Sequence, residues 1–298
     1  MIVNGVSVDD TFAEAFAMRG TRLIITAQTL GWARTAAVSM TGFATSVIGC
    51  GLEAGIECEL DGARTPDGRP GIAVLLFATS SSELAKQLER RVGQCVLTSP
   101  TSAVFSGIAS GRPLPLGKTL RYFGDGHQIS KVIGGRHYWR VPVMDGEFIA
   151  EDTAAMSDAI GGGNFLILAS GASQALAAAE AAIEAMRRVS GAIMPFPGGI
   201  ARSGSKVGSK YKALIASTNH AFCPTLRASV DSELGPDVEC VLEIVIDGLT
   251  EEAVRHSMQA GLRAVCAVGA AGGILRLSAG NYGGKLGKFH FPLRALLS

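Results

Sequence analysis

The chain has 298 residues, of which 47% are hydrophobic, 18% are charged and 6% are aromatic, and its formal net charge is +1. This length allows a large buried core and predicts about two domains, and the apolar content excludes a disordered chain. The near-neutral charge and the few aromatic side chains argue against a nucleic-acid groove and a membrane-surface patch, so we expect neither partner.

The N-terminal sequence lacks a basic stretch followed by an apolar one, and no apolar stretch reaches membrane-spanning length, so we expect a cytoplasmic protein. The six cysteines form no C-x-x-C pair, and the five histidines show no H-x-H or H-x-x-x-H spacing. These spacings predict buried free thiols and no metal site. The low charge also favours a surface that other chains partly cover.

In chain order, the first half alternates strands and helices. Asn4-Gly5 predicts a hairpin turn, and Thr11 with Glu14 fits the capping box of a helix that carries Phe12 and Phe16 on one face. The further elements expected here are a strand at 22–27, a helix at 29–40, a strand at 45–50 extended irregularly to 60, a loop at 65–71, a strand at 72–77, a helix capped by Ser80, and a strand at 118–123.

The second half repeats this order of elements. We expect a strand at 163–169, a helix capped by Ser173 and stopped by Gly191, strands at 192–195 and 240–246, a helix capped by Thr250, and a strand at 273–279. Each half therefore contains β-α-β twice in succession. Two such units in tandem form a ferredoxin-like lobe, in which an antiparallel sheet carries two helices on one face.

We therefore predict an α+β fold of two ferredoxin-like lobes related by internal duplication. The first lobe is expected at 1–145 and the second at 146–286, with the segment 287–298 returning to the first lobe. A Rossmann fold is disfavoured, because no predicted strand runs into a G-x-G-x-x-G helix start.

The stretch Pro195–Lys210, which reads PFPGGIARSGSKVGSK, is rich in glycine, serine and cations. Its glycines allow close approach of the backbone, and Arg202, Lys206 and Lys210 add positive charge, which suits an anionic ligand. It is a near miss to the phosphate-binding pattern GxxxxGK[ST], with serine where lysine should follow the glycine. The alternative is a polar surface loop.

Five polar glycine clusters fall at the ends of predicted strands, at 41–46, 122–126, 161–165, 195–210 and 279–286. Convergence of such loops between the lobes would form a long cleft with walls made mostly of backbone. The alternative is that these glycines only turn the chain.

Eight segments resemble the formylmethanofuran:tetrahydromethanopterin formyltransferase family, and the resemblance runs from residue 9 to the C-terminus. They are DDTFAEAFAMRGTRLIITA, TGFATSVIGCGLEAGIECEL, TPDGRPGIAVLLF, GGGNFLILA, PFPGGIARSGSKVGSKY, STNHAFCPTL, CVLEIVIDGLTEEAV and SAGNYGGKLGKFHF. The resemblance implies two α+β lobes and formyl transfer between the amine of methanofuran and N5 of tetrahydromethanopterin, without a metal. It also implies either a homo-oligomer or the transferase subunit of a hetero-oligomeric formyltransferase/hydrolase complex.

Formyl transfer between an amide and an amine passes through a tetrahedral carbon that bears a negative oxygen. The site must supply N–H donors to that oxygen and a group that carries protons between the two amines. Glu243 in VLEIV lies between Val241 and Val245 on one face of a predicted strand, so its pKa is expected to be raised. The proposed acid/base glutamate of the family maps here, and the alternative is a paired, structural glutamate.

Further polar residues in the resembling motifs are expected to bind the two carriers. They are Asn164, Arg202, Ser205, Lys206, Ser209, Lys210, Asn219, His220 and Asn281. The lysines and the arginine among them are expected to contact the carboxylate-rich tails of the carriers. The competing prediction is an inactive scaffold or carrier-binding subunit of a larger complex. Glu243 favours the enzyme, because a scaffold needs no proton carrier.

Overall fold

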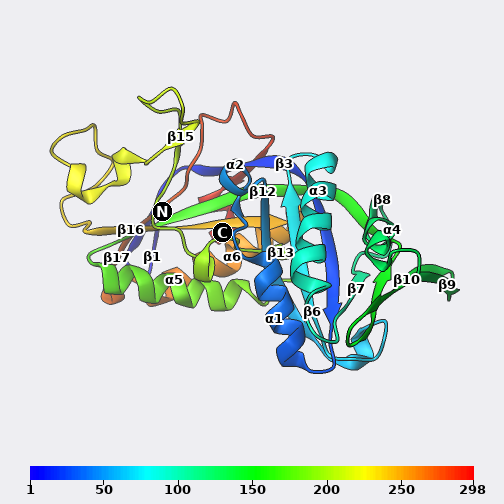
Figure 1. Cartoon of the computed structure of the whole chain (residues 1–298). Helices are drawn as coiled ribbons and strands as arrows, with labels where there is room; N and C mark the ends of the chain where they lie inside the picture. The colour runs from blue at the N-terminus through cyan, green and yellow to red at the C-terminus, as the bar shows by residue number, and fades with distance from the viewer.

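Two long antiparallel strands, β3 (Phe12–Thr26) and β12 (Thr153–Ala169), cross at the centre of the molecule and run through both of its lobes. The structure is a computed structural model that describes residues 1–298. It shows a mixed α+β protein of two lobes, with both termini at the lobe that contains α5 and α6 (Figure 1).

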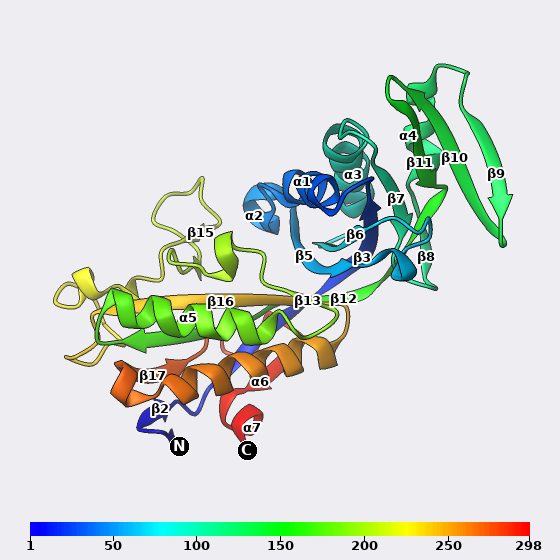
Figure 2. The ribbon, with the colours of Figure 1, turned by 90° about the horizontal axis from the view of Figure 1, so that it is seen from below.

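The first lobe has an antiparallel sheet in the order β7-β3-β6-β5, with two helices on one face (Figure 2). Besides β3, its elements are β5 (Leu52–Leu60), β6 (Gly71–Ala78), β7 (Ala103–Ser106), α1 (Leu30–Thr41) and α3 (Ser81–Arg91). Leu23, Val74 and Leu76 on that face form one core with Leu84 and Leu88 of α3. The hydroxyl of Ser80 caps α3, as predicted.

The second lobe repeats this arrangement with an antiparallel sheet in the order β17-β12-β16-β13. Besides β12, its elements are β13 (Ala192–Ile193), β16 (Cys240–Gly248), β17 (Ile274–Ser278), α5 (Ala172–Met186) and α6 (Glu251–Val268). Phe165, Ile167, Ile244 and Ile246 point toward α5 and α6 and form the second core. The hydroxyl of Thr250 caps α6, as predicted. In both lobes the sheet order is therefore fourth, first, third and second strand.

The other elements extend the two sheets or lie outside them, and β14 and β15 form a separate two-stranded sheet. These are β1 (Ile2–Val3), β2 (Val6–Val8), β4 (Thr45–Ser46), α2 (Val47–Cys50), β8 (Arg112–Pro115), α4 (Gly117–Leu120), β9 (Ile129–Ile133), β10 (Arg136–Val143), β11 (Gly146–Glu151), β14 (Lys206–Val207), β15 (Ala216–Ser217), β18 (Phe289–Pro292) and α7 (Leu293–Leu297). Short 3-10 turns occupy 62–64, 121–124, 197–199, 220–222, 224–226 and 270–272, and a π-helical turn occupies 92–96. The β9–β10 hairpin projects away from the lobes (Figure 2).

The terminal segments pack against elements far away in the sequence. The predicted hairpin at Asn4-Gly5 is present, and β2 adds to the second-lobe sheet beside β17 in parallel. Near the C-terminus, β18 pairs with the first four residues of β3, and α7 contacts α6.

The helix predicted to begin at Thr11 is wrong, because Phe12–Thr26 is the strand β3. A spacing of four places Phe12 and Phe16 on one face of a helix and equally on one face of a strand. Pairing with β18 and β12 decides between the two. Glu14 accordingly is not part of a capping box.

Three smaller predictions are also corrected. Residues 118–123 form α4 and a 3-10 turn instead of a strand, because Leu116 and Leu120, four residues apart, are both buried. Of the strand predicted at 45–50, only Thr45–Ser46 is extended and the rest is α2. Helix α5 begins at Ala172 after Gly171, so Ser173 does not cap it.

The glycines at 161–163 mark the crossing of β3 and β12. A Cβ atom on Gly161 would lie 1.9 Å from Sδ of Met18, and Gly162 has a φ of +88°. The pairing of β12 with β16 shifts register at the same place. Close packing of β12 on β3 therefore requires Gly161, and the backbone conformation at the next position favours Gly162.

Candidate active site

A pocket of about 580 Å³ lies on the face of the second-lobe sheet that points away from α5 and α6. Leu166 and Leu168 of β12 point to this face, where they pack with Leu234 and Val238 of the segment that follows β15. This segment lies across the sheet from α6 (Figure 2). The pocket is closed by the same segment, by residues 7–11 and by the loop that follows β17.

Glu243 reaches this pocket from the middle of β16. It lies opposite Leu166 in the β12–β16 ladder, while its neighbour Ile244 is buried under the helices. Its backbone N–H donates to the carbonyl of Ala201 at 2.9 Å, and the N–H of Ala201 donates back to the carbonyl of Glu243 at 2.8 Å. The strand is thus held on both sides, and alternation directs the carboxyl group into the pocket.

Burial raises the pKa of the Glu243 carboxyl group to about 7. No cation forms an ion pair with this side chain, and no hydrogen bond within the chain reaches it. A carboxyl group with this pKa takes up and releases a proton near neutral pH, which suits a general acid or base.

Ser205, Lys206 and Asn219 line the same pocket as Glu243. A short ladder between β14 and β15, in which Lys206 pairs with Ser217, places them there. The other two cations of the pocket are neutralised, since Arg276 pairs with Asp9 at 2.8 Å and Arg294 with Asp10 at 3.1 Å. Lys206 has no carboxylate partner and is available to an anionic ligand.

Asn164 and Asn281 also line the pocket, but their amides are used inside the chain. The amide of Asn164 donates to the carbonyls of Gly162 and Gly280, both at 3.1 Å, and accepts from the N–H of Gly280 at 2.6 Å. The amide of Asn281 donates to Oγ1 of Thr11 at 3.0 Å. Both residues hold the loop after β17 in place.

Four of the expected binding residues do not line the pocket: Arg202, Ser209, Lys210 and His220. Arg202 and Lys210 are exposed, and Ser209 accepts a hydrogen bond from the N–H of Tyr211 at 3.0 Å. His220 begins a 3-10 turn beside Asn219.

The stretch 195–210 divides between two pockets. Residues 195–199 line a second pocket, of about 620 Å³, between the lobes, where α1, β5 and α5 also contribute. There a Cβ atom on Gly199 would lie 2.4 Å from Cδ1 of Ile183, so this glycine serves packing. Only Ser205 and Lys206 of the stretch reach the pocket that contains Glu243.

Sequence reasoning missed Tyr282 and Glu14. Tyr282 lines the pocket from the loop after β17, and Glu14 is buried in β3 and hydrogen-bonded to that loop. The tyrosine stands in the glycine cluster at 279–286, which singled out the loop without singling out the side chain. The sequence pattern places Glu14 in a helix cap, so it does not indicate the hydrogen bonds that Glu14 accepts from this loop.

No three side chains of His, Cys, Asp or Glu are grouped so that they could hold a metal ion. None of the helices combines the length and apolar character needed to cross a membrane.

Two family models together match almost the whole chain. "Formylmethanofuran-tetrahydromethanopterin formyltransferase" matches residues 1–143, and "FTR, proximal lobe" matches residues 146–296. The chain belongs to the formylmethanofuran–tetrahydromethanopterin formyltransferase family. The resemblance seen in its motifs is thereby confirmed, and the chain is a formyltransferase.

Relatives in this formyltransferase family match over their full length. The formylmethanofuran–tetrahydromethanopterin formyltransferase of Methylococcus capsulatus is 66% identical and covers 100% of both chains. A crystal structure of the formyltransferase/hydrolase complex from Methylorubrum extorquens with methylofuran contains a chain that is 52% identical, with a TM-score of 0.98 over 100% of this chain and 99% of that one. The enzyme of Methanosarcina barkeri is 46% identical, with a TM-score of 0.94 over 100% of both chains.

Proposed function

We propose that this formyltransferase moves the formyl group between the amine of methanofuran and N5 of tetrahydromethanopterin in the pocket that contains Glu243. The family and the full-length relatives support the choice of carriers. The observation that supports the site is a mostly buried carboxyl group with a pKa of about 7, facing a pocket lined by polar side chains and one unpaired lysine.

In the proposed reaction, the acceptor nitrogen attacks the formyl carbon and Glu243 takes the proton that this nitrogen loses. A new C–N bond forms, the negative oxygen of the tetrahedral intermediate receives hydrogen bonds, and the C–N bond to the donor breaks. Glu243 then returns its proton to the departing nitrogen, so one carboxyl group serves both amines. We propose that the step needs no metal or redox group, because it involves only acyl transfer and proton transfer.

We assign the recognition of the carriers to the polar rim of the pocket. Lys206 is placed to meet a carboxylate of a carrier tail, and Ser205 and the free amide of Asn219 are placed to donate hydrogen bonds. Asn164 and Asn281 would act by holding the loop after β17. Arg202, Ser209, Lys210 and His220 belong to the segments that border the pocket, and we propose that they contact parts of the carriers that extend beyond it.

We further infer that the lobes are ferredoxin-like units related by internal duplication. The shared sheet order, with two helices on one face of each sheet, supports this inference. We propose the division 1–145 and 146–286, and we assign 287–298 to the second lobe instead of the first, because Phe291, Leu293 and Leu296 belong to the core under α5 and α6.

We propose that the enzyme is cytoplasmic and works in an assembly without a nucleic-acid or membrane partner. The assembly is either a homo-oligomer or a complex such as the formyltransferase/hydrolase complex that contains the relative from Methylorubrum extorquens. The mass of the particle isolated from its native source decides between the two.

The proposed site is tested with Glu243→Gln, which keeps the shape of the side chain and removes its ability to exchange a proton. We expect kcat for formyl transfer between the purified carriers to fall by a factor of roughly 10² to 10⁴. The matched control is Glu239→Gln, an exposed carboxylate just before the same strand, which should leave kcat unchanged. Normal turnover by Glu243→Gln would remove this residue from the mechanism.

A further inference from the structure

Glu14 is a buried carboxylate whose partners are all backbone N–H groups of one loop. Its Oε1 accepts from Leu286 and Gly287, both at 2.6 Å, and its Oε2 accepts from Tyr282 at 2.6 Å and Gly284 at 2.9 Å. No lysine or arginine forms an ion pair with it, and its exposed fraction is 0%. Four convergent donors satisfy the charge without a cation.

These hydrogen bonds keep Glu14 ionised. Burial opposes ionisation, but the four backbone donors outweigh it and lower the pKa of Glu14 to about 2. The carboxylate is therefore charged at every pH at which the enzyme is expected to work.

The loop around Glu14 is held in a single conformation. A Cβ atom on Gly287 would lie 2.4 Å from the carbonyl oxygen of Ala15 and 2.8 Å from Cγ of Glu14, so there is no space for a side chain there. Gly283 and Gly284 have φ values of +74° and +71°, which favour glycine. The amide of Asn281 ties the start of the loop to β3.

The side chain that this loop brings to the pocket is Tyr282, which lines the same pocket as Glu243. Its ring packs near that of Phe16, with centroids 6.0 Å apart, and its hydroxyl forms no hydrogen bond within the chain. Burial and then the nearby charges of Glu243 and Glu14 raise the pKa of Tyr282. The hydroxyl thus keeps its proton and is free to donate it in a hydrogen bond.

We propose that the Tyr282 hydroxyl donates a hydrogen bond to the oxygen of the transferring formyl group, and that Glu14 is the positioning residue that sets Tyr282 beside Glu243. Tyr282 then supplies one of the donors that the negative oxygen requires. Glu14 acts through the backbone of the loop and does not touch the substrate. This inference rests on the proposed site at Glu243.

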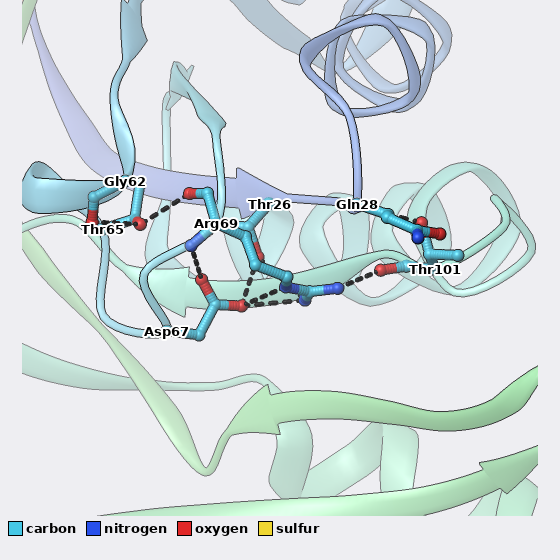
Figure 3. Close-up of polar contacts among 7 residues, drawn as sticks. All are labelled: Thr26, Gln28, Gly62, Thr65, Asp67, Arg69 and Thr101. Carbon is cyan, nitrogen blue, oxygen red and sulfur yellow. Dashed lines mark hydrogen bonds and ion pairs between the residues drawn. The ribbon is translucent and has the colours of Figure 1, made fainter.

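Asp67 offers a matched control, since it also organises a loop by accepting hydrogen bonds. Its Oδ2 accepts a hydrogen bond from the hydroxyl of Thr26 at 2.7 Å and another from Nε of Arg69 at 2.8 Å. Nη1 of Arg69 in turn donates to the carbonyl of Thr101 at 2.5 Å (Figure 3). This cluster belongs to the first lobe and does not line the pocket with Glu243. Loss of its charge tests general stability without touching the Tyr282 loop.

The experiment compares Tyr282→Phe, Glu14→Gln, the double variant and Asp67→Asn in formyl transfer between the purified carriers. We expect Tyr282→Phe to lower kcat about 100-fold with little change in KM. Glu14→Gln should lower kcat about 10-fold or more, because its amide N–H₂ faces N–H donors and displaces the loop. The double variant should be no slower than Tyr282→Phe, since Glu14 acts through Tyr282. Glu14→Asp, which keeps the charge, should recover part of the activity, and Asp67→Asn should keep the wild-type kcat.

Unchanged kcat in Tyr282→Phe overturns the inference, whatever the stability of the Glu14 variants. If the double variant lowers kcat by the product of the two single-variant factors, the positioning role of Glu14 is overturned. If Glu243→Gln is inactive while Tyr282→Phe is fully active, only this inference fails. If both variants keep full activity, the proposed site itself is wrong.

Discussion

The carboxyl groups of Glu53 and Asp247 lie against each other across the boundary between the two lobes. Glu53 is on β5 of the first lobe and Asp247 is on β16 of the second, and both are buried. The N–H of Val47 donates to Oε1 of Glu53 at 3.1 Å, and that of Gly162 donates to Oδ1 of Asp247 at 3.0 Å. Burial raises the pKa of both groups, and the charge of Glu53 raises that of Asp247 further. Each carboxyl group therefore holds its proton to a higher pH than an exposed one does.

This pair predicts how stability depends on pH. Unfolded Asp247 ionises near pH 3.9, about the ordinary value for aspartate, whereas the folded protein holds the proton to a much higher pH. Its contribution to the free energy of unfolding is therefore complete in acid and is lost as the pH rises above about 4. Asp247→Asn, whose amide can donate to Glu53, should flatten the fall of Tm between pH 4 and 8. A curve parallel to that of the wild type would show that folded Asp247 ionises normally.

The activity of the enzyme should depend on pH through Glu243. Since its pKa is about 7 and the proposed step begins with the carboxylate, kcat/KM should fall about tenfold for each pH unit below 7 and level off above it. The profile is measured with tetrahydromethanopterin as the acceptor, in buffers of constant ionic strength. An apparent pKa near 4 would contradict the raised value.

Lys206 should act on binding more than on chemistry. Lys206→Gln removes the unpaired cation of the pocket, and we expect KM for a carrier with a carboxylate tail to rise about tenfold, because a hydrogen bond to a charged group contributes about 1.5 kcal/mol. The value of kcat should change little. Lys212→Gln, at an exposed lysine outside the pocket, is the matched control. Equal effects of the two variants would indicate general attraction of anions instead of a defined contact.

The loop after β17 should be intolerant of side chains at Gly287. Gly287→Ala places a methyl group 2.4 Å from the carbonyl oxygen of Ala15, and we expect a loss of about 1–3 kcal/mol in the free energy of unfolding. Gly235→Ala, where nothing lies within 4 Å, is the control and should change stability by less than about 0.5 kcal/mol. Urea unfolding of both variants measures the difference. Equal stability would mean that the loop rearranges around the methyl group.

Local sequence signals predicted those elements that depend on local contacts. The caps at Ser80 and Thr250 each bond a backbone N–H three residues ahead, so their signal is contained within one turn of helix. The strand at 240–246 was visible from its run of apolar residues, which only Glu243 interrupts. The strand at Phe12–Thr26 was missed because its spacing fits a helix equally well, and only pairing with residues 289–292 and 156–161 resolves the ambiguity.

By itself the sequence determined the family, the formyl-transfer chemistry and an acid among valines at Glu243, since long motifs and strand alternation are properties of adjacent residues. Only the tertiary structure decided that Ser205, Lys206 and Asn219 share the pocket with Glu243. It also brought Glu14 to the Tyr282 loop, more than 260 residues later in the chain. Burial and hydrogen bonds between distant segments arise only when folding brings those segments together. No local sequence pattern therefore encodes these contacts.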